Sequence, residues 1–192
     1  MEQNKEMTAQ ESLKLITETM NNSRKDILRS SGKHLLFWGV LLTIFSLAIF
    51  LLWNASGKGA WNYLWFAMPV VGMPVTRLLN KGAAPVPESL ISKMLGGVWS
   101  AYGIFAMCAA ALALFLVPFN ITVTIILLFG FAESVSGIIL KNWTVIVSGF
   151  ILAMGGMFIG VKYAAEPAQL LIFTLGGVVL AVTGLVVKKQ NK

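Results

Sequence analysis

The chain has 192 residues, of which 57% are hydrophobic and only 12% are charged, and its net charge is +7. A soluble domain has about twice that share of charged residues, so the composition excludes an ordinary soluble protein and is typical of a protein that lives in lipid. We therefore expect an all-α, polytopic membrane helix bundle. Basic residues beside a membrane account for the positive charge, so we expect no direct nucleic acid binding.

Residues 1–34 are polar and helix-prone, and we predict that they form a cytoplasmic amphipathic helix ahead of the first membrane span. Thr8 followed three residues later by Glu11 is the pattern of a capping box, in which two side chains bond the free amides at a helix start. Apolar residues then recur at spacings of three, four and seven, which places them on one narrow face. The members of this face are Leu13, Ile16, Met20 and Ile27.

An apolar face on a polar helix has to be covered by something. One interpretation is that it lies on the inner membrane surface or packs on its own bundle. The other is that it docks a cytoplasmic protein partner or a second copy of the chain. Glu11, Glu18 and Asp26 share this helix with its basic residues. These acids weaken the membrane interpretation, because helices that bind anionic membranes normally carry a strongly basic polar face.

Six runs of mostly apolar residues follow, each close to the length of about 20 residues that an α-helix needs to cross a bilayer. The runs cover residues 35–53, 61–79, 94–117, 121–140, 143–162 and 168–187. The connections between them are too short to fold as domains. Residues 35–187 are therefore predicted to form one six-helix transmembrane domain, and residues 188–192 a basic cytoplasmic tail.

The Lys and Arg residues predict how the chain is oriented. When six spans are drawn, all but two of the 15 basic residues fall on one side of the membrane, the exceptions being Lys58 and Lys162. Cytoplasmic loops normally carry this excess. We therefore predict a multi-pass membrane protein with both termini in the cytoplasm, where its basic residues contact anionic lipid of the bilayer.

Small residues are expected to hold the spans together, since helices in lipid approach closely only where side chains are small. The helix-packing residues that we predict are Gly130, Ser134 and Gly137 in the fourth span, Gly156 and Gly160 in the fifth, and Gly177 and Gly184 in the sixth. The glycines of the last two spans lead us to expect a tight terminal hairpin between them.

Glu133 is the only one of the eight acidic residues that lies inside a long apolar run. It shares a helix face with small residues, so we expect it to point into the bundle. A rise of 1.5 Å per residue from Lys141 puts it roughly 12 Å deep. The same count places Thr43 and Tyr102 near that depth. Arg77 lies closer to the cytoplasm, but its long side chain can reach inwards, so Arg77 is the first candidate partner of Glu133 and Tyr102 the second.

Two interpretations of Glu133 remain open. It is either a structural acid, neutral or hydrogen-bonded, that fixes how the helices pack, or a proton or ion site, because ionisable residues inside a membrane often mark such pathways. A transporter usually needs more ionisable groups than one acid, and the spans contain no second acid and no histidine. This favours the structural interpretation.

No motif in the sequence indicates an enzyme. The single histidine, His34, stands at the membrane boundary, and the single cysteine, Cys108, cannot form a disulfide or a thiolate metal site within one chain. The glycine pairs lie inside apolar runs and not at a strand-to-helix turn, so no phosphate-binding loop is predicted. We therefore expect a non-enzymatic protein with no metal and no cofactor.

Several stretches resemble a family of uncharacterised bacterial six-span inner-membrane proteins of about this length. These stretches are ESLKLITETM, HLLFWG, WFAMPVVGMP, LGGVWSAYGIF and FGFAESVSGIILK. The family resembles proteins encoded near small winged-helix regulators, which implies a regulatory or signal-linked role. A triple-hairpin organisation gives a weaker similarity to the HdeD-like acid-resistance membrane proteins, although the polar lead departs from that pattern. Neither resemblance implies particular binding residues.

We therefore expect a membrane-embedded regulatory or interaction module with a cytoplasmic docking helix. The alternative is a small proton- or ion-coupled transporter or channel subunit that uses Glu133. The first function predicts that Leu13, Ile16 and Met20 matter and that Glu133→Gln is mild. The second predicts a continuous polar path through the bundle and loss of function in Glu133→Gln.

Overall fold

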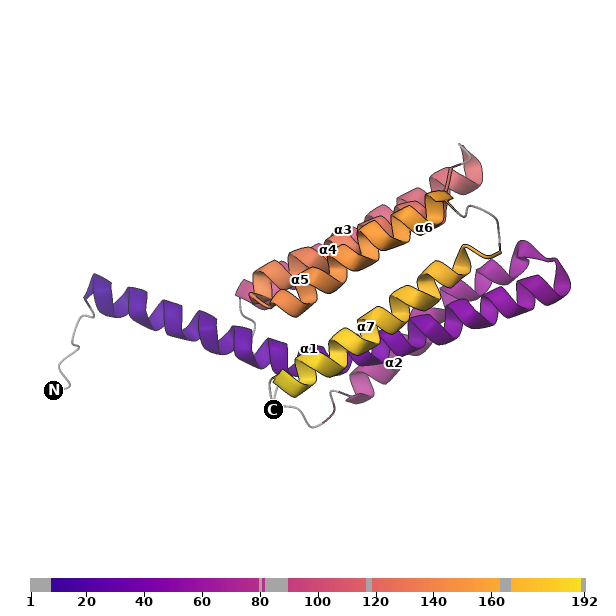
Figure 1. Ribbon diagram of the computed structural model, residues 1–192. Helices are drawn as coiled ribbons and strands as arrows, with labels where there is room; N and C mark the ends of the chain where they lie inside the picture. Colours follow the sequence, from indigo (N-terminus) through magenta and orange to yellow (C-terminus); the bar gives the residue numbers. More distant parts are fainter. Residues whose placement is uncertain (1–7, 80, 82–89, 117–118, 163–166, 191–192) are drawn as a thin grey trace.

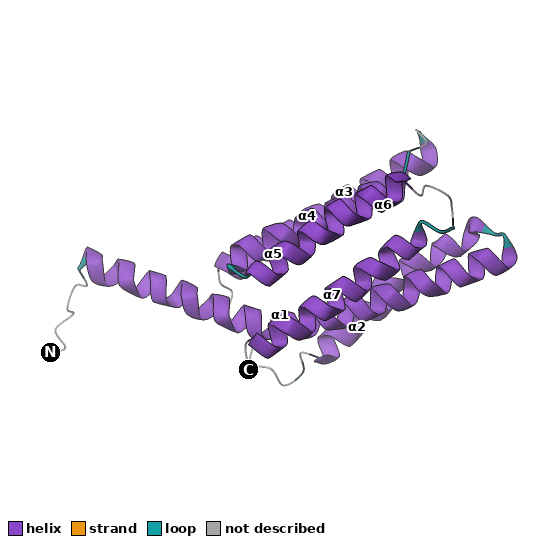
Figure 2. Ribbon diagram, in the orientation of Figure 1, coloured by secondary structure: helices purple, strands orange, loops and turns teal. Residues whose placement is uncertain are grey.

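The structure is a computed structural model that describes residues 8–79, 81, 90–116, 119–162 and 167–190. Within these ranges every regular element is helical (Figure 2). In chain order they are α1 (Ala9–Ser56), the 3-10 helix η1 (Gly59–Phe66), α2 (Ala67–Leu79), α3 (Leu90–Phe115), α4 (Ile121–Leu140), α5 (Trp143–Phe150), the π-helix η2 (Ile151–Gly155), α6 (Gly156–Lys162) and α7 (Leu170–Gln190).

The described chain contains five helical segments that are long and apolar enough to cross a membrane. They are Ala9–Ser56, Leu90–Ala113, Ile121–Leu140, Trp143–Lys162 and Leu170–Gln190. The all-α class and the membrane-helix character that the sequence predicts are therefore confirmed.

The predicted span 61–79 is built from two shorter elements, η1 and α2. Pro69 lies in the first turn of α2, where its missing amide removes no helical hydrogen bond, so it favours the start of a new α-helix there. Pro74 lies inside α2. The α-helical part is thereby limited to 13 residues, which is shorter than a membrane span of about 20 residues. Six spans therefore remain a prediction.

α1 does not break at residue 34, where the sequence led us to divide the chain, but runs as one helix of 48 residues. The predicted capping box is present, since Glu11 N donates to Thr8 Oγ1 at 3.3 Å and Thr8 N donates to Glu11 Oε2 at 2.9 Å. At the other end Gly57 stops the helix in a left-handed conformation, with φ of 68°, that favours glycine.

The amino-terminal part of α1 leaves the bundle at an angle (Figure 1). Local sequence explains this change of direction. The hydroxyls of Ser30 and Ser31 both donate to the carbonyl oxygen of Ile27, at 2.9 and 2.7 Å. Such bonds to the preceding turn bend a helix. Gly32, next to the two serines, has no side chain to oppose the bend, and Gly/Ser pairs are a common cause of helix kinks.

The helices lie in two groups, with α3 to α6 in one and α1, α2 and α7 in the other (Figure 1). The most extensive packing within the groups is of α1 on α7 and of α4 on α5. Only Lys141 and Asn142 separate α4 from α5. Lys141 adopts a left-handed conformation with φ of 52°, and the Asn142 side chain accepts from Val145 N at the start of α5. This tight turn makes α4 and α5 run antiparallel, side by side.

The contact between α1 and α7, here called the α1–α7 seam, is made by glycines seven residues apart. α1 contributes Gly32 and Gly39, and α7 contributes Gly177 and Gly184. A Cβ at Gly39 would lie 2.6 Å from Gly177 O, and one at Gly184 would lie 2.8 Å from Gly32 O, so only hydrogen fits. The expected tight terminal hairpin is therefore wrong. Gly177 and Gly184 of α7 pack on α1, because α1 offers glycines at the same spacing.

One hydrophobic cluster joins α1 to the ends of four other helices. Its buried members are Ile27, Leu28, Ile91, Leu140, Val145 and Val187. Beside it, Arg24 Nε donates to the carbonyl oxygen of Ile139 at 3.2 Å, at the end of α4. The segment 24–28 of α1 therefore belongs to the bundle, whereas residues 9–23 extend beyond it.

Candidate functional site

The carboxyl group of Glu133 is completely buried, with 0% of the residue exposed. Its Oε1 lies 2.5 Å from Ser148 Oγ of α5, and the two atoms share a hydrogen bond. The other oxygen, Oε2, is buried without a hydrogen-bond partner among the described residues. A buried polar atom without a partner costs free energy. This half-satisfied acid is therefore the strongest candidate site in the bundle.

The turn between α4 and α5 places Glu133 opposite Ser148. The two residues lie almost equally far from Lys141 along their antiparallel helices. Glycines then bring the backbones together, since a Cβ at Gly149 would lie 2.6 Å from Gly130 O. This α4–α5 seam presses the carboxyl against the serine hydroxyl.

The backbone beside this site is irregular. The π-helix η2 begins three residues after Ser148 and packs against α4. Single π-turns are rare, and they occur frequently at functional sites. The sequence reasoning missed both Ser148 and η2. The hairpin register about Lys141 could have identified Ser148, whereas the nearest clue to η2 is the pair Gly155–Gly156, which lowers helix propensity.

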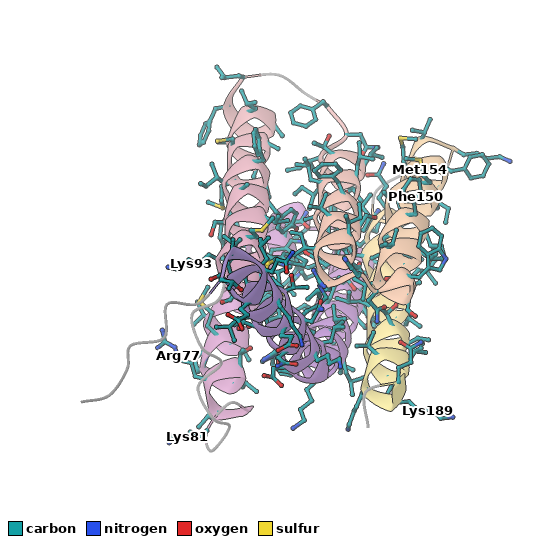
Figure 3. The ribbon with its side chains drawn as sticks, turned by 90° about the vertical axis from the view of Figure 1, so that its left-hand side faces the viewer. Arg77, Lys81, Lys93, Phe150, Met154 and Lys189 are labelled. Carbon is teal, nitrogen blue, oxygen red and sulfur yellow. The ribbon has the colours of Figure 1, made fainter. Side chains whose placement is uncertain are left out.

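Arg77, the first partner predicted for Glu133, lies elsewhere. Its side chain is exposed on α2, which packs on α1 and η1. Figure 3 shows Arg77 at the edge of the bundle, on the side away from Phe150 and Met154. The prediction is wrong because a count along the helix axis gives depth but does not give position around the bundle.

The other two predicted partners also make different contacts. The Tyr102 ring packs edge-on against Trp99 and Phe129, with centroid distances of 5.8 and 5.5 Å. Phe129 is one turn from Glu133, so Tyr102 neighbours α4, but no described hydrogen bond joins it to Glu133. Thr43 Oγ1 donates to Gly39 O at 2.9 Å and lies at the α1–α7 seam.

The small residues predicted to pack helices all lie at contacts. Gly130, Ser134 and Gly137 face α5, where Ser134 Oγ donates to Ile146 O at 3.3 Å. Gly156 and Gly160 face isoleucine and valine side chains of α4 and α7. Gly177 and Gly184 face α1. Gly32 and Gly39, their counterparts, were missed, although their seven-residue spacing is visible in the sequence.

The predicted docking face at the amino-terminal helix divides into two parts. Leu13 is 64% exposed and Ile16 is 56% exposed, while Met20 is half-buried. Ile27 is only 7% exposed and lies in the hydrophobic cluster of the bundle. Assigning Ile27 to the docking face is therefore wrong, because the chain covers this residue itself. Leu15 is also exposed and was not predicted.

No group of three or more His, Cys, Asp or Glu side chains in the described part of the chain could hold a metal ion. A shallow hollow on the outer face of α5 and η2 is lined only by apolar side chains. They are Trp143, Ile146, Val147, Phe150, Ile151 and Met154. Such a surface suits contact with lipid and does not lead to Glu133.

Fold and site together define an all-helical protein with several helices that could cross a membrane and a buried carboxyl between two of them. Comparison of the chain with protein families, curated proteins and solved structures found no match. The resemblance to the bacterial six-span family and the weaker similarity to the HdeD-like proteins therefore stay predictions from the sequence.

Proposed function

We propose that the chain is a non-enzymatic interaction module of the bacterial inner membrane, with six spans and both termini in the cytoplasm, whose amino-terminal helix docks a cytoplasmic protein. The observation that carries this proposal is the exposure of Leu13 and Ile16 on a helix that continues without a break into the bundle. A partner held on residues 9–23 is thereby connected to the membrane domain through one continuous helix.

Exposed aliphatic residues on this helix favour a partner. Full burial of a Leu or Ile side chain stabilises a complex by about 1.5 to 3 kcal/mol. The surrounding charges are mixed, with Glu11 and Glu18 beside Lys14, which suits a protein surface better than an anionic membrane. A narrow face of this kind typically inserts into a groove or pairs with another helix.

The described basic residues support the orientation. Arg24 and Lys141 lie at the end of the bundle that holds the hydrophobic cluster, where α7 also ends with Lys188 and Lys189. Lys58 and Lys162 lie at the opposite end. The elements η1 and α2 follow each other directly over residues 59–79, and we propose that together they form the sixth span.

Photocrosslinking in intact cells tests the docking role. A photoreactive residue at position 16 should form an adduct of defined mass with another protein. The matched control is position 18, on the opposite side of the same helix, and a second control is position 44, which is exposed on the bundle. Adducts with lipid or with the same chain alone at position 16 would contradict the proposal, and a differently tagged second copy identifies self-association.

A second candidate function is a small proton- or ion-coupled transporter or channel subunit, and the half-satisfied carboxyl of Glu133 is the observation that favours it. Substitutions at Ile16 and Glu133 distinguish the two functions. Docking is lost in Ile16→Glu and kept in Glu133→Gln. Transport shows the reverse pattern when ion or proton uptake is measured in vesicles that contain the purified protein, with Ser136→Ala as a control for a buried hydroxyl on the same helix.

A further inference from the structure

The hydroxyl of Ser148 has two acceptors but only one hydrogen. Its Oγ lies 3.0 Å from Val145 O and 2.5 Å from Glu133 Oε1. A serine hydroxyl donates one hydrogen and accepts with its lone pairs. When that hydrogen goes to one of the two oxygens, the second contact needs a hydrogen from the other side. The carbonyl of Val145 has none to give, so a carboxyl proton on Glu133 is the available source.

We propose that Glu133 is a proton-binding site, in which the neutral carboxyl donates from Oε1 to Ser148 Oγ while Ser148 donates to Val145 O. Each hydrogen then has one acceptor, and the two bonds form a short chain from α4 into α5. This proton site does not depend on the docking function of the amino-terminal helix.

The surroundings of the carboxyl favour a neutral group. Oε2 is buried without a partner in the described chain. In an ionised carboxylate this oxygen would carry about half of an unpaired buried charge, which is far more costly than an unpaired neutral oxygen. A neutral acid leaves only an unpaired carbonyl oxygen there.

Charged groups on the neighbouring elements do not offset an ionised Glu133. On α3, Tyr102 packs on Phe129 and Cys108 is exposed. The sequence places no titratable side chain in α5 or η2. On α3, α6 and α7 the remaining cationic groups are Lys93, Lys162, Lys188 and Lys189, toward the ends of these helices. On α1 the charged and titratable groups all lie within residues 11–34, where Arg24 donates to the carbonyl oxygen of Ile139, six residues from Glu133. A bound proton is therefore the neutralising partner that the geometry supplies.

The proton also joins the two helices. Without the proton, the hydroxyl of Ser148 would have to donate to the carboxylate instead of to Val145 O, and Oε2 would still lack a partner. The glycine contact between Gly130 and Gly149 leaves no room for the helices to adjust locally. Release of the proton therefore requires the α4–α5 seam to open.

Infrared difference spectroscopy of the full chain in lipid vesicles at pH 7 tests the proposal. The wild type should show a carbonyl-stretch band of a protonated carboxyl that is absent in Glu133→Gln. Ser148→Ala should shift this band to higher frequency, because the hydrogen bond is lost. Ser136→Ala, which removes a buried hydroxyl bonded only within α4, should leave the band unchanged.

Absence of a protonated-carboxyl band at pH 7 would overturn the proposal. A band that does not move in Ser148→Ala, or that disappears when sodium replaces choline in the buffer, would overturn it as well. If Glu133→Gln fails to fold, the test uses wild-type protein labelled with an isotope at the glutamate carboxyl groups. The isotope shift then assigns the band to a glutamate, and the effect of Ser148→Ala assigns it to Glu133.

Discussion

The α1–α7 seam and the α4–α5 seam both join antiparallel helices through glycines, but their buried polar groups differ. In the α1–α7 seam, Ser46 Oγ and Thr174 Oγ1 lie 2.9 Å apart, so one hydroxyl donates to the other, and the accepting hydroxyl donates to a carbonyl oxygen of its own helix. In the α4–α5 seam, one oxygen of Glu133 has no described partner. The same backbone arrangement thus holds a satisfied pair in one place and a half-satisfied acid in the other. Satisfied pairs stabilise a fold, whereas unsatisfied buried groups point to function.

The largest expected effect comes from breaking the glycine contact of the α1–α7 seam. A Cβ at Gly177 would lie 2.7 Å from Gly39 O, so Gly177→Leu forces the helices apart. We expect the free energy of unfolding to fall by about 3 kcal/mol, the upper part of the usual range for overpacking. Unfolding in mixed detergent micelles measures the change.

Gly96 of α3 provides the matched control, because a Cβ there would meet nothing within 4 Å. Gly96→Leu should leave stability unchanged or raise it by less than about 1 kcal/mol, since glycine is a poor helix former. Equal losses in the two variants would show that the seam does not hold the bundle together.

Substitutions of Glu133 test the buried acid of the α4–α5 seam. Glu133→Ala should lower the free energy of unfolding by about 2 kcal/mol, because it leaves a cavity and removes the bond to Ser148. Glu133→Gln should cost less than about 1 kcal/mol, since the amide keeps the volume and can donate to Ser148. The same unfolding assay compares the two, and equal losses would argue against a neutral acid at this position.

A smaller effect is expected from the polar pair of the α1–α7 seam. Thr174→Val keeps the shape of the side chain but removes the bond to Ser46. Hydrogen bonds between membrane helices contribute about 0.6 kcal/mol on average, so we expect a loss of about that size. The control is Thr124, whose hydroxyl donates to the carbonyl oxygen of Asn120, the capping residue of the same helix, and does not join two helices. Thr124→Val should therefore change stability less.

The smallest effect concerns the start of α1, outside both seams. Hydrogen bonds from the Thr8 backbone amide, and then from its hydroxyl, hold the pKa of Glu11 below its ordinary value of 4.5. The bonds that the Glu11 carboxylate accepts therefore stabilise the helix start fully above pH 4.5, and they are lost as the pH falls through the lowered pKa. Hydrogen exchange should show residues 9–12 opening below that pH in the wild type, while Thr8→Ala opens them at all pH values.

Sequence reasoning succeeded where the pattern was local. Hydrophobic runs located the apolar helices, and a three-residue spacing located the cap at Thr8 and Glu11. It failed where position around the bundle mattered. Depth alone suggested Arg77 for Glu133, whereas the turn at Lys141 determines that Ser148 is the neighbour.

The glycines illustrate the same limit. Gly177 and Gly184 could be identified as packing residues from composition, because small residues bring membrane helices together. Their partner could not be inferred from chain order, which suggested the preceding span. The matching spacing of Gly32 and Gly39 carries that information, and it is non-local.

The unbroken course of α1 makes this helix a lever. Its 48 residues correspond to a length of about 72 Å, and residues 9–23, about 22 Å of it, extend beyond the bundle. A rotation of about 10° where this segment meets the bundle therefore displaces the amino end by about 4 Å. At that point Arg24 Nε donates to the carbonyl oxygen of Ile139, near the end of α4. A force on the amino end is thus transmitted to the helix that carries Glu133, six residues before Ile139.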